Sequence, residues 1–222
     1  MIVTIDGPAG SGKSTVARLL ARRLGVSHLD TGAMYRAVTV AGMERGVDLA
    51  DEAALEWLAG EIKIEMRERA GKLQVLVDGK DVTAAIRENQ VSCEAYHAAS
   101  NAGVRAHLVA VQREIGRQWG SLVTEGRDQG SVVFSKAELK IYLDASEEVR
   151  AERRRKELAE RGQEAALGQV REEIRHRDAS DRGRAVGPLR VPEGAVVVDT
   201  SEMTVEEVVE KLAGLAAERM KN

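Results

Sequence analysis

The 222-residue chain carries 33 Lys and Arg against 36 Asp and Glu, a formal net charge of −3, and 43% of its residues are hydrophobic. This apolar content is enough for one domain with its own core, and the balanced charge argues against a general nucleic-acid or membrane-surface binder. No apolar run approaches the ~20 residues that cross a bilayer. A strand-like segment begins at Met1, so we expect no signal peptide. The single cysteine excludes an intramolecular disulfide framework, and we expect a soluble cytoplasmic protein.

Short apolar runs separated by helical stretches predict the secondary structure. The strand candidates are residues 2–6, 26–30, 121–124, 139–144 and 195–199. The first and the last two of these runs end in Asp, which is typical of central strands of a parallel sheet that are buried on both faces. Apolar residues at spacings of three and four, such as Val16, Leu20 and Leu24, predict helices between the strands. This alternation predicts an open α/β fold with right-handed crossovers.

A phosphate-binding loop follows the first strand. The run from Gly7 to Ser14 matches G-x-x-x-x-G-K-[ST] at every position and precedes an amphipathic helix. The glycines allow backbone N–H groups to point at phosphate oxygens, Lys13 can reach the β- and γ-phosphates, and the Ser14 hydroxyl can bind Mg²⁺. A chance glycine-rich turn is the alternative, and the agreement of strand, motif and helix argues against it. We therefore expect a nucleoside triphosphate here.

The P-loop alone leaves the class of protein open, because GTPases, motors and small-molecule kinases share it. The chain has no Asn-Lys-x-Asp guanine signature, which argues against a GTP switch, and its 222 residues are few for a motor. A kinase needs in addition a pocket for an acceptor and arginines that neutralise charge during transfer. The remaining motifs favour that class.

The second strand leads into Asp30-Thr-Gly-Ala-Met-Tyr-Arg36. Thr31 and Gly32 can start a helix, and Arg36 follows about one turn later, beside the amino end of that helix. Such a position suits an acceptor phosphate. An ordinary helix start capped by Asp30 or Thr31 is the alternative, and both can hold together.

The hydrophobic period changes to two between Ile62 and Val82. Two alternating segments are joined by a turn around Gly71, and Asp78-Gly79 is typical of a tight hairpin. We therefore expect a small antiparallel meander inserted at about residues 62–100. A hairpin without a role in function is the alternative.

Two further segments supply charged residues. Arg127 and Asp128 follow another strand in Thr124-Glu-Gly-Arg-Asp-Gln-Gly130, at the strand end where ligands bind in open α/β sheets, although a simple salt bridge is the alternative. Residues 150–190 hold 12 Lys and Arg against 8 Asp and Glu. This excess fits either a solvated helix with many ion pairs or a mobile lid that brings guanidinium groups over a polyphosphate.

A helical face is predicted for Arg177, Asp181 and Arg184, which are spaced i, i+4 and i+7, provided that the helix continues through Gly183. This spacing would present two guanidinium groups and a carboxylate to a nucleotide, with a solvated ion-pair ladder as the alternative. The last helix is predicted to open at a capping box formed by Thr204 and Glu207.

These motifs, taken in order along nearly the whole chain, resemble the bacterial cytidylate kinases, a family of nucleoside-monophosphate kinases. The matching stretches are residues 5–15, 29–36, 77–83, 125–130 and 177–189. The resemblance implies a P-loop kinase core with a five-stranded parallel sheet flanked by helices, formed by residues 1–61 and 101–222. It also implies an acceptor-binding insertion at 62–100, an Arg-rich lid at about 150–165, and transfer of the γ-phosphoryl group of ATP, with Mg²⁺, to CMP or dCMP.

The resemblance also implies roles for individual residues. ATP would be bound by Gly7, Pro8, Ala9, Gly10, Ser11, Gly12, Lys13, Ser14 and Thr15, with Ser14 as the metal ligand. The acceptor would be bound by Thr31, Arg36, Arg105, Arg127, Asp128, Arg177, Asp181 and Arg184. The catalytic groups would be Lys13, Arg127, Arg153 and Arg154. The partners implied are small molecules, neither nucleic acid nor membrane, and we expect a monomer.

One position departs from the family pattern. Tyr96 stands where a small hydroxyl residue is expected to contact the base, and Ser92 or Ser100 could take its place. The four histidines show no metal or triad spacing, and we expect Cys93 to be a small buried hydrophobic residue. The alternatives are a kinase for another acceptor such as UMP, dTMP or shikimate, and a P-loop protein that binds ATP as a regulatory ligand.

Overall fold

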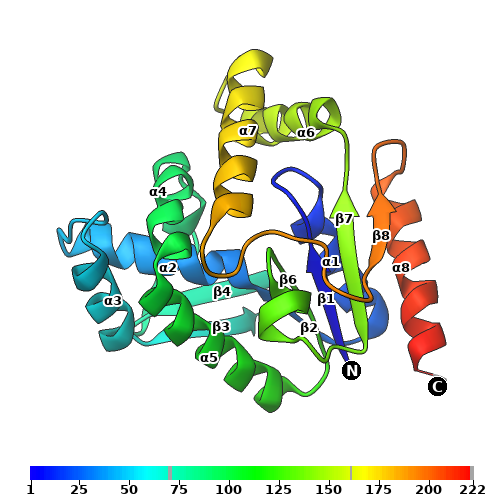
Figure 1. Cartoon of the computed structure of the whole chain (residues 1–222), viewed down its shortest axis with the longest axis horizontal. Coiled ribbons are helices and arrows are strands. Elements are labelled where there is room, and N and C mark those ends of the chain that lie inside the picture. The colour runs from blue at the N-terminus through cyan, green and yellow to red at the C-terminus, as the bar shows by residue number, and fades with distance from the viewer. Residues whose placement is uncertain (70–71, 161, 221–222) are drawn as a thin grey trace. The chain divides into compact units, whose positions relative to one another are not determined.

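The computed structural model describes residues 1–69, 72–160 and 162–220, and the chain forms two compact units (Figure 1). Unit 1 consists of Met1–Leu29 and Gly116–Asn222, and unit 2 consists of Asp30–Ile115. The predicted insertion at 62–100 lies within unit 2. Its role in binding an acceptor stays a prediction.

A five-stranded parallel sheet forms the centre of unit 1, with the strand order β2-β6-β1-β7-β8. The strands are β1 (Ile2–Asp6), β2 (Ser27–Asp30), β6 (Leu122–Gly126), β7 (Leu139–Asp144) and β8 (Val196–Asp199). The register places Asp6 of β1 opposite Gly126 of β6 and Tyr142 of β7. The carboxyl ends of these three neighbouring strands therefore meet at one edge of the sheet.

One face of this sheet is covered by α1 (Lys13–Leu24) and α8 (Val205–Arg219), which pack on each other (Figure 1). Their apolar stripes and the strands share one core, in which Val3, Ile5 and Leu20 are fully buried. The predicted capping box at the start of α8 is confirmed, since Thr204 and Glu207 bond reciprocally. Each helix thus forms where the 3.6-residue period predicts it.

The predicted strands occur with small shifts in their ends, but one prediction about burial was wrong. Residues 195–199 were expected to form a central strand, whereas β8 lies at the edge of the sheet and Val197 is 55% exposed. A run of valines fits an edge strand as well as a central one, because the neighbours of a strand decide how much of it is buried.

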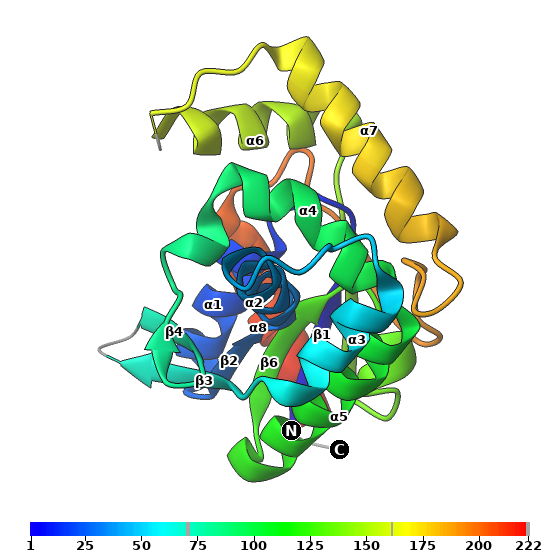
Figure 2. The ribbon, with the colours of Figure 1, turned by 90° about the vertical axis from the view of Figure 1, so that its left-hand side faces the viewer.

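Two long helices follow β7 within unit 1. These are α6 (Glu147–Glu160) and α7 (Leu167–Gly183), which lie against each other in both views (Figure 2). Ala151, Leu158, Val170 and Ile174 form a small core between them. The basic segment at 150–190 is therefore largely a packed helical pair. Earlier in unit 1, a single turn of π-helix, η2 (Gln129–Val133), follows β6.

Unit 2 combines helices with a small antiparallel sheet in the order β3-β4-β5. Its elements are α2 (Thr31–Glu44), α3 (Glu52–Glu61), β3 (Ile64–Arg69), β4 (Lys72–Val77), β5 (Lys80–Asp81), η1 (Ala85–Arg87) and α4 (Asn89–Ser100), and α5 (Ala102–Trp119) begins in it. The hairpin at Asp78-Gly79 is confirmed: both residues have positive φ, 49° and 81°. The turn predicted around Gly71 lies outside the described residues.

None of the helices in the described ranges has the combination of length and apolar character that crossing a bilayer requires.

Candidate active site

The loop between β1 and α1 adopts a backbone that only glycine accepts readily at three positions. Gly7, Gly10 and Gly12 have φ of 155°, 77° and 87°. A Cβ atom on Gly7 would lie 2.1 Å from the carbonyl oxygen of Leu143, and one on Gly10 would lie 2.9 Å from that of Arg150. The loop therefore packs directly on β7 and α6, and the glycines are required by space as well as by conformation.

Lys13 is buried at the first turn of α1, with 5% of its surface exposed. Its Nζ donates to the carbonyl oxygen of Pro8 at 2.6 Å and to Oγ of Ser11 at 3.3 Å, so the ammonium group lies inside the loop. Burial lowers the pKa of Lys13 to about 7, and the positive charge of Arg127 acts in the same direction. A bound polyanion at this point would restore the charged form.

The residues present fit a magnesium ion held beside a triphosphate. Ser14 is exposed at the start of α1, and Glu125 is a buried carboxylate at the end of β6 whose charge acts on Lys13. Hydroxyl and carboxylate oxygens are hard ligands of the kind that Mg²⁺ prefers, and it is commonly bound by few protein groups plus phosphates. The described part of the chain has no cluster of three or more acidic, His or Cys side chains suited to a metal. Glu125 was not predicted as a site residue, although its position directly after a predicted strand could have identified it.

The loop after β6 is held from β1 through Asp6. The two carboxylate oxygens of Asp6 accept hydrogen bonds from the backbone N–H groups of Gln129 and Gly130, each at 2.8 Å. Burial raises the pKa of Asp6 to about 6, against the effect of these two bonds. Asp128 is buried and precedes η2, as the strand-end prediction placed it. Asp6 was not predicted as a site residue, although its two hydrogen bonds fix the backbone of this loop.

Arg127 pairs with Asp181 and not with its neighbour Asp128. Its Nε donates to Oδ2 of Asp181 at 2.5 Å, and Arg184 also donates to this carboxylate. Burial opposes the charge on Asp181, but Arg127, Arg184 and Arg177 together lower its pKa to about 2. Within its described residues, the structure therefore does not have the simple Arg127–Asp128 ion pair that was the alternative. Instead, the positive charges of the three arginines surround the carboxylate of Asp181.

The helical face predicted for Arg177, Asp181 and Arg184 required the helix to continue through Gly183, and this condition is not met for Arg184. The helix α7 ends at Gly183, and Arg184 is extended at its C-cap with φ −60° and ψ 135°. Its guanidinium group still reaches Asp181 because the chain turns back there, with the N–H of Leu189 bonded to the carbonyl oxygen of Asp181 at 2.8 Å. Arg177 is exposed on α7, and its charge acts on Asp181 and on Lys13.

The predicted lid arginines lie on α6. Arg153 donates to Oγ1 of Thr200 at 3.0 Å and to its carbonyl oxygen at 2.7 Å, and Arg154 donates to Glu157 at 2.9 Å. Other arginines of this segment also form ion pairs: Arg155 with Glu152, and Arg171 and Arg175 with Glu147. Much of the basic segment is therefore an ion-paired helical surface, which was one of the two interpretations.

The acceptor motif at 30–36 lies in unit 2. Asp30 caps α2, accepting from the N–H of Ala33 at 2.9 Å, and its other oxygen accepts from Nη2 of Arg36 at 3.2 Å. Thr31 is buried as the first residue of the helix. The capped helix start is confirmed, and Arg36 is held by the same carboxylate beside the amino end of α2.

Arg105 is the largest fully buried side chain of unit 2, at 2% exposure. Its Nη1 donates to Oη of Tyr35 at 3.2 Å, and its guanidinium carbon lies 5.7 Å from the centroid of that ring.

Two residues of α4 were also considered in the sequence. Tyr96 is half-exposed and lies against the ring of His97. The prediction that Cys93 is buried was wrong: it is exposed on α4.

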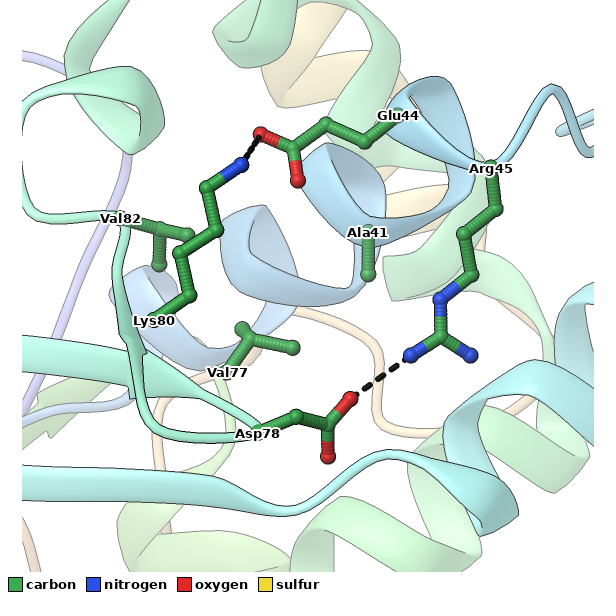
Figure 3. Close-up of a pocket in the computed structure, with 7 residues that line it drawn as sticks. All are labelled: Ala41, Glu44, Arg45, Val77, Asp78, Lys80 and Val82. Carbon is green, nitrogen blue, oxygen red and sulfur yellow. Dashed lines mark hydrogen bonds and ion pairs between the residues drawn. The ribbon is translucent and has the colours of Figure 1, made fainter.

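A cavity of about 190 Å³ in unit 2 lies between the end of α2 and the β4–β5 hairpin (Figure 3). Two ion pairs lie among the residues that line it, Lys80 to Glu44 at 2.8 Å and Arg45 to Asp78 at 2.7 Å. The residues that line it include none of the predicted site residues. The ion pairs join α2 to the hairpin, and we assign this cavity no ligand.

The parallel sheet, the glycine loop with its buried lysine, and the cluster of arginines in unit 1 define a protein of the P-loop nucleoside-triphosphate-binding class. The family model described as cytidylate kinase matches residues 3–218. The chain is 48% identical to the cytidylate kinase of Pelotomaculum thermopropionicum, over 95% of this chain and 93% of that protein. It is 42% identical to the cytidylate kinase of Aeromonas salmonicida, over 99% and 95% of the two chains.

Among solved structures, an uncharacterized protein from Eubacterium ventriosum is similar with a TM-score of 0.55 at 9% identity, covering 97% of each chain, which concerns the fold alone. The chain belongs to the cytidylate kinase family. It is an enzyme of the nucleoside-monophosphate kinase type.

Proposed function

We propose that this protein transfers the γ-phosphoryl group of ATP to CMP and dCMP, forming CDP and dCDP with ADP. The observation that carries the proposal is the buried ammonium group of Lys13 inside the glycine loop, in a chain that matches the cytidylate kinase family over residues 3–218. A buried cation in the phosphate loop is suited to charge that spreads over a transferring phosphoryl group.

The donor side is formed by unit 1. Residues Gly7 to Thr15 form the loop that holds the triphosphate, through backbone N–H groups from Gly10 onward and through Lys13, and Ser14 offers its exposed hydroxyl to Mg²⁺. When bound, Mg²⁺ supplies further neutralisation of the phosphate oxygens. Arg153 and Arg154 of α6 are the lid arginines of this proposal, and they would leave Thr200 and Glu157 to reach the phosphates.

The acceptor side uses arginines and carboxylates from separate motifs. Arg36 and Arg127 bind the phosphate of the acceptor. Arg105, Asp128 and Arg184 lie near the base, and Arg177 and Asp181 lie near the sugar hydroxyls. Thr31 is a further acceptor-binding residue. The phosphate oxygen of CMP is ionised at neutral pH, so the reaction needs no strong general base. Catalysis then depends on positioning and on charge neutralisation by Lys13, Arg127 and the lid arginines.

Small nucleotides are the partners in this proposal, and nucleic acid and membranes are not. The near-neutral net charge of −3 supports that choice, since a nucleic-acid binder would carry a large positive excess. We further propose that the protein acts as a monomer in the cytoplasm.

A coupled assay of ADP release tests the function. The purified protein is given ATP and Mg²⁺ with CMP, dCMP, UMP, AMP and dTMP in turn. We expect CMP and dCMP to stimulate ADP release well above the other acceptors. Preference for UMP or another acceptor would reassign the substrate, and slow hydrolysis without dependence on any acceptor would indicate a regulatory ATP-binding protein.

A further inference from the structure

A buried ion pair joins the two helices that follow β7, and the proposed function gives it no role. Arg150 near the start of α6 is 6% exposed, and Asp178 near the end of α7 is 4% exposed. Nη1 of Arg150 donates to Oδ2 of Asp178 at 2.6 Å. Two charges in such a place need further hydrogen bonds, because water does not reach them.

Those further bonds go to the P-loop. The backbone N–H of Ala9 donates to Oδ1 of Asp178 at 3.2 Å, and the carbonyl oxygen of Ala9 accepts from Nη1 of Arg150 at 3.0 Å. Nε of Arg150 donates in addition to the carbonyl oxygen of Ala145 at 3.0 Å. Both polar backbone groups of Ala9 are therefore held by one ion pair, in the middle of the loop.

Close packing reinforces this link at the next residue. A Cβ atom on Gly10 would lie 2.9 Å from the carbonyl oxygen of Arg150 and 3.0 Å from its Cβ. The loop backbone thus rests on α6 without a side chain between them. Since Gly10 to Lys13 must direct their N–H groups at the phosphates, a rotation of the Ala9 peptide would misdirect the residues that follow.

We propose that Arg150 and Asp178 are positioning residues that hold the Ala9 peptide of the P-loop in the orientation required for the triphosphate, with α6 and α7 as the support. The pair acts through the backbone and does not touch the substrate. The inference rests on the proposed function only in taking the loop as the ATP site, and it is independent of the acceptor.

The matched control is Glu147, whose carboxylate also joins α6 to α7. It accepts from Arg175 at 2.9 Å and from Arg171, and these contacts lie on the partly exposed side of the helix pair. The substitution Glu147→Gln weakens the bridge between the two helices and leaves Ala9 untouched. It therefore separates support of the helix pair from support of the loop.

The test measures ATP binding by calorimetry without acceptor, CMP binding without ATP, and urea unfolding. The variants are Asp178→Asn, the double variant Arg150→Met with Asp178→Leu, and Glu147→Gln. The double variant removes both charges together, so that neither is left buried alone, and Asp178→Asn keeps the shape of the side chain if the double variant does not fold. We expect folded Asp178→Asn and double variants to bind ATP about tenfold or more weakly, with CMP binding changed less than about twofold.

Glu147→Gln is expected to bind both nucleotides as the parent does. Parent-like ATP binding by a folded double variant or by Asp178→Asn would overturn the proposal, and so would an equal loss of CMP binding, which indicates a general structural role. Because ATP binding is measured alone, a protein that binds ATP but does not phosphorylate CMP would contradict the proposed function and leave this inference intact.

Discussion

Nε of Arg127 donates to Oδ2 of Asp181 at 2.5 Å, which joins the loop after β6 to the helix α7 across 54 positions of sequence. The same carboxylate accepts from Arg184, so one buried negative charge holds two guanidinium groups in place. Fixed guanidinium groups lose less entropy when they bind an anion than free ones. This cluster therefore presents fixed guanidinium groups on the proposed acceptor side in unit 1.

Replacing Asp181 by Asn should weaken the use of CMP. Loss of the carboxylate leaves Arg127 and Arg184 without their shared partner, and breaking such a charge pair corresponds to about a tenfold or greater rise in the KM for CMP. The KM for ATP should change much less. Initial rates at varied CMP and at varied ATP measure the two values. The control is Glu172→Gln, an exposed carboxylate of the same helix, and an unchanged KM for CMP in Asp181→Asn would contradict the role given to this residue.

Replacing Lys13 by Ala should reduce turnover by about a hundredfold or more, the scale found when one preorganised group that stabilises the transition state is removed. The ammonium group lies inside the loop, bonded to the carbonyl oxygen of Pro8, and the substitution removes it. The measurement is kcat for CMP with saturating ATP and Mg²⁺. Arg18→Ala, an exposed cation on the same helix, should keep parent-like turnover. Ordinary turnover in Lys13→Ala would end the proposed mechanism.

ATP binding should take up a proton above neutral pH. Burial lowers the pKa of Lys13 to about 7 in the free protein, and the negative charge of ATP should raise it again. Between pH 7 and the ordinary range of lysine, binding therefore converts a neutral amine into an ammonium ion, and affinity should fall as the pH rises. Calorimetry at pH 8 in buffers of different ionisation enthalpy measures this uptake. No proton exchange would indicate that Lys13 is already charged in the free protein, and proton release would contradict the expected uptake.

The same lowered pKa has a consequence for stability. The unfolded chain holds the proton of Lys13 up to its ordinary pKa of 10.5, whereas the folded protein releases it at about 7. The unfolded state therefore binds more protons between these values, and this lysine makes the protein more stable as the pH rises through that window. Urea unfolding of the parent and of Lys13→Met at pH 6.5 and pH 9 measures this contribution. From pH 6.5 to pH 9, the free energy of unfolding of the parent should increase relative to that of the variant.

Replacing Gly10 by Ala should weaken ATP binding by more than the strain of its left-handed backbone conformation accounts for. Gly10 and Gly25 have similar positive φ of 77° and 68°, but a Cβ atom on Gly25 meets nothing within 4 Å, whereas one on Gly10 meets the backbone of Arg150. Both Ala variants should lose roughly 1–2 kcal/mol of stability from the left-handed conformation. Only Gly10→Ala should weaken ATP binding, as measured by calorimetry. Equal ATP affinity in the two variants would show that the close approach to α6 does not shape the loop.

Arg36→Ala should raise the KM for the monophosphate acceptor by about tenfold or more, as expected when a charged hydrogen bond to phosphate is lost. The control lies on the same helix: Arg45 at the C-cap of α2 pairs with the partly exposed Asp78 at 2.7 Å, and its removal should leave the KM for CMP unchanged. Initial rates at varied CMP give both values. Equal effects of the two substitutions would point to the stability of α2 and not to contact of Arg36 with phosphate.

Several local features could be predicted from the sequence because neighbouring residues determine them. The P-loop is contiguous, and its glycines, the strand before it and the helix after it are each recognised by composition and period. The caps of Asp30 and Thr204 and the hairpin at Asp78-Gly79 were predictable for the same reason, since each depends on residues within a few positions.

Burial and the choice of partners could not be read in this way. The valine-rich strand β8 was placed in the centre of the sheet and lies at its edge, and Cys93 was expected to be buried and is exposed. Arg127 was followed by Asp128 in the sequence, yet it pairs with Asp181. In each case the result depends on which elements become neighbours, and hydrophobic period does not specify that.

The sequence by itself determined the order of the five main strands along the chain, the phosphate loop and the family to which the motifs belong, because these follow from short-range spacing. Only the tertiary structure decided that Asp178 holds the N–H of Ala9 across 169 positions and that Asp6 fixes the loop at Gln129 and Gly130. Buried polar groups must find partners wherever the fold brings them, and those partners are set by the strand order β2-β6-β1-β7-β8 and by the packing of α6 on α7.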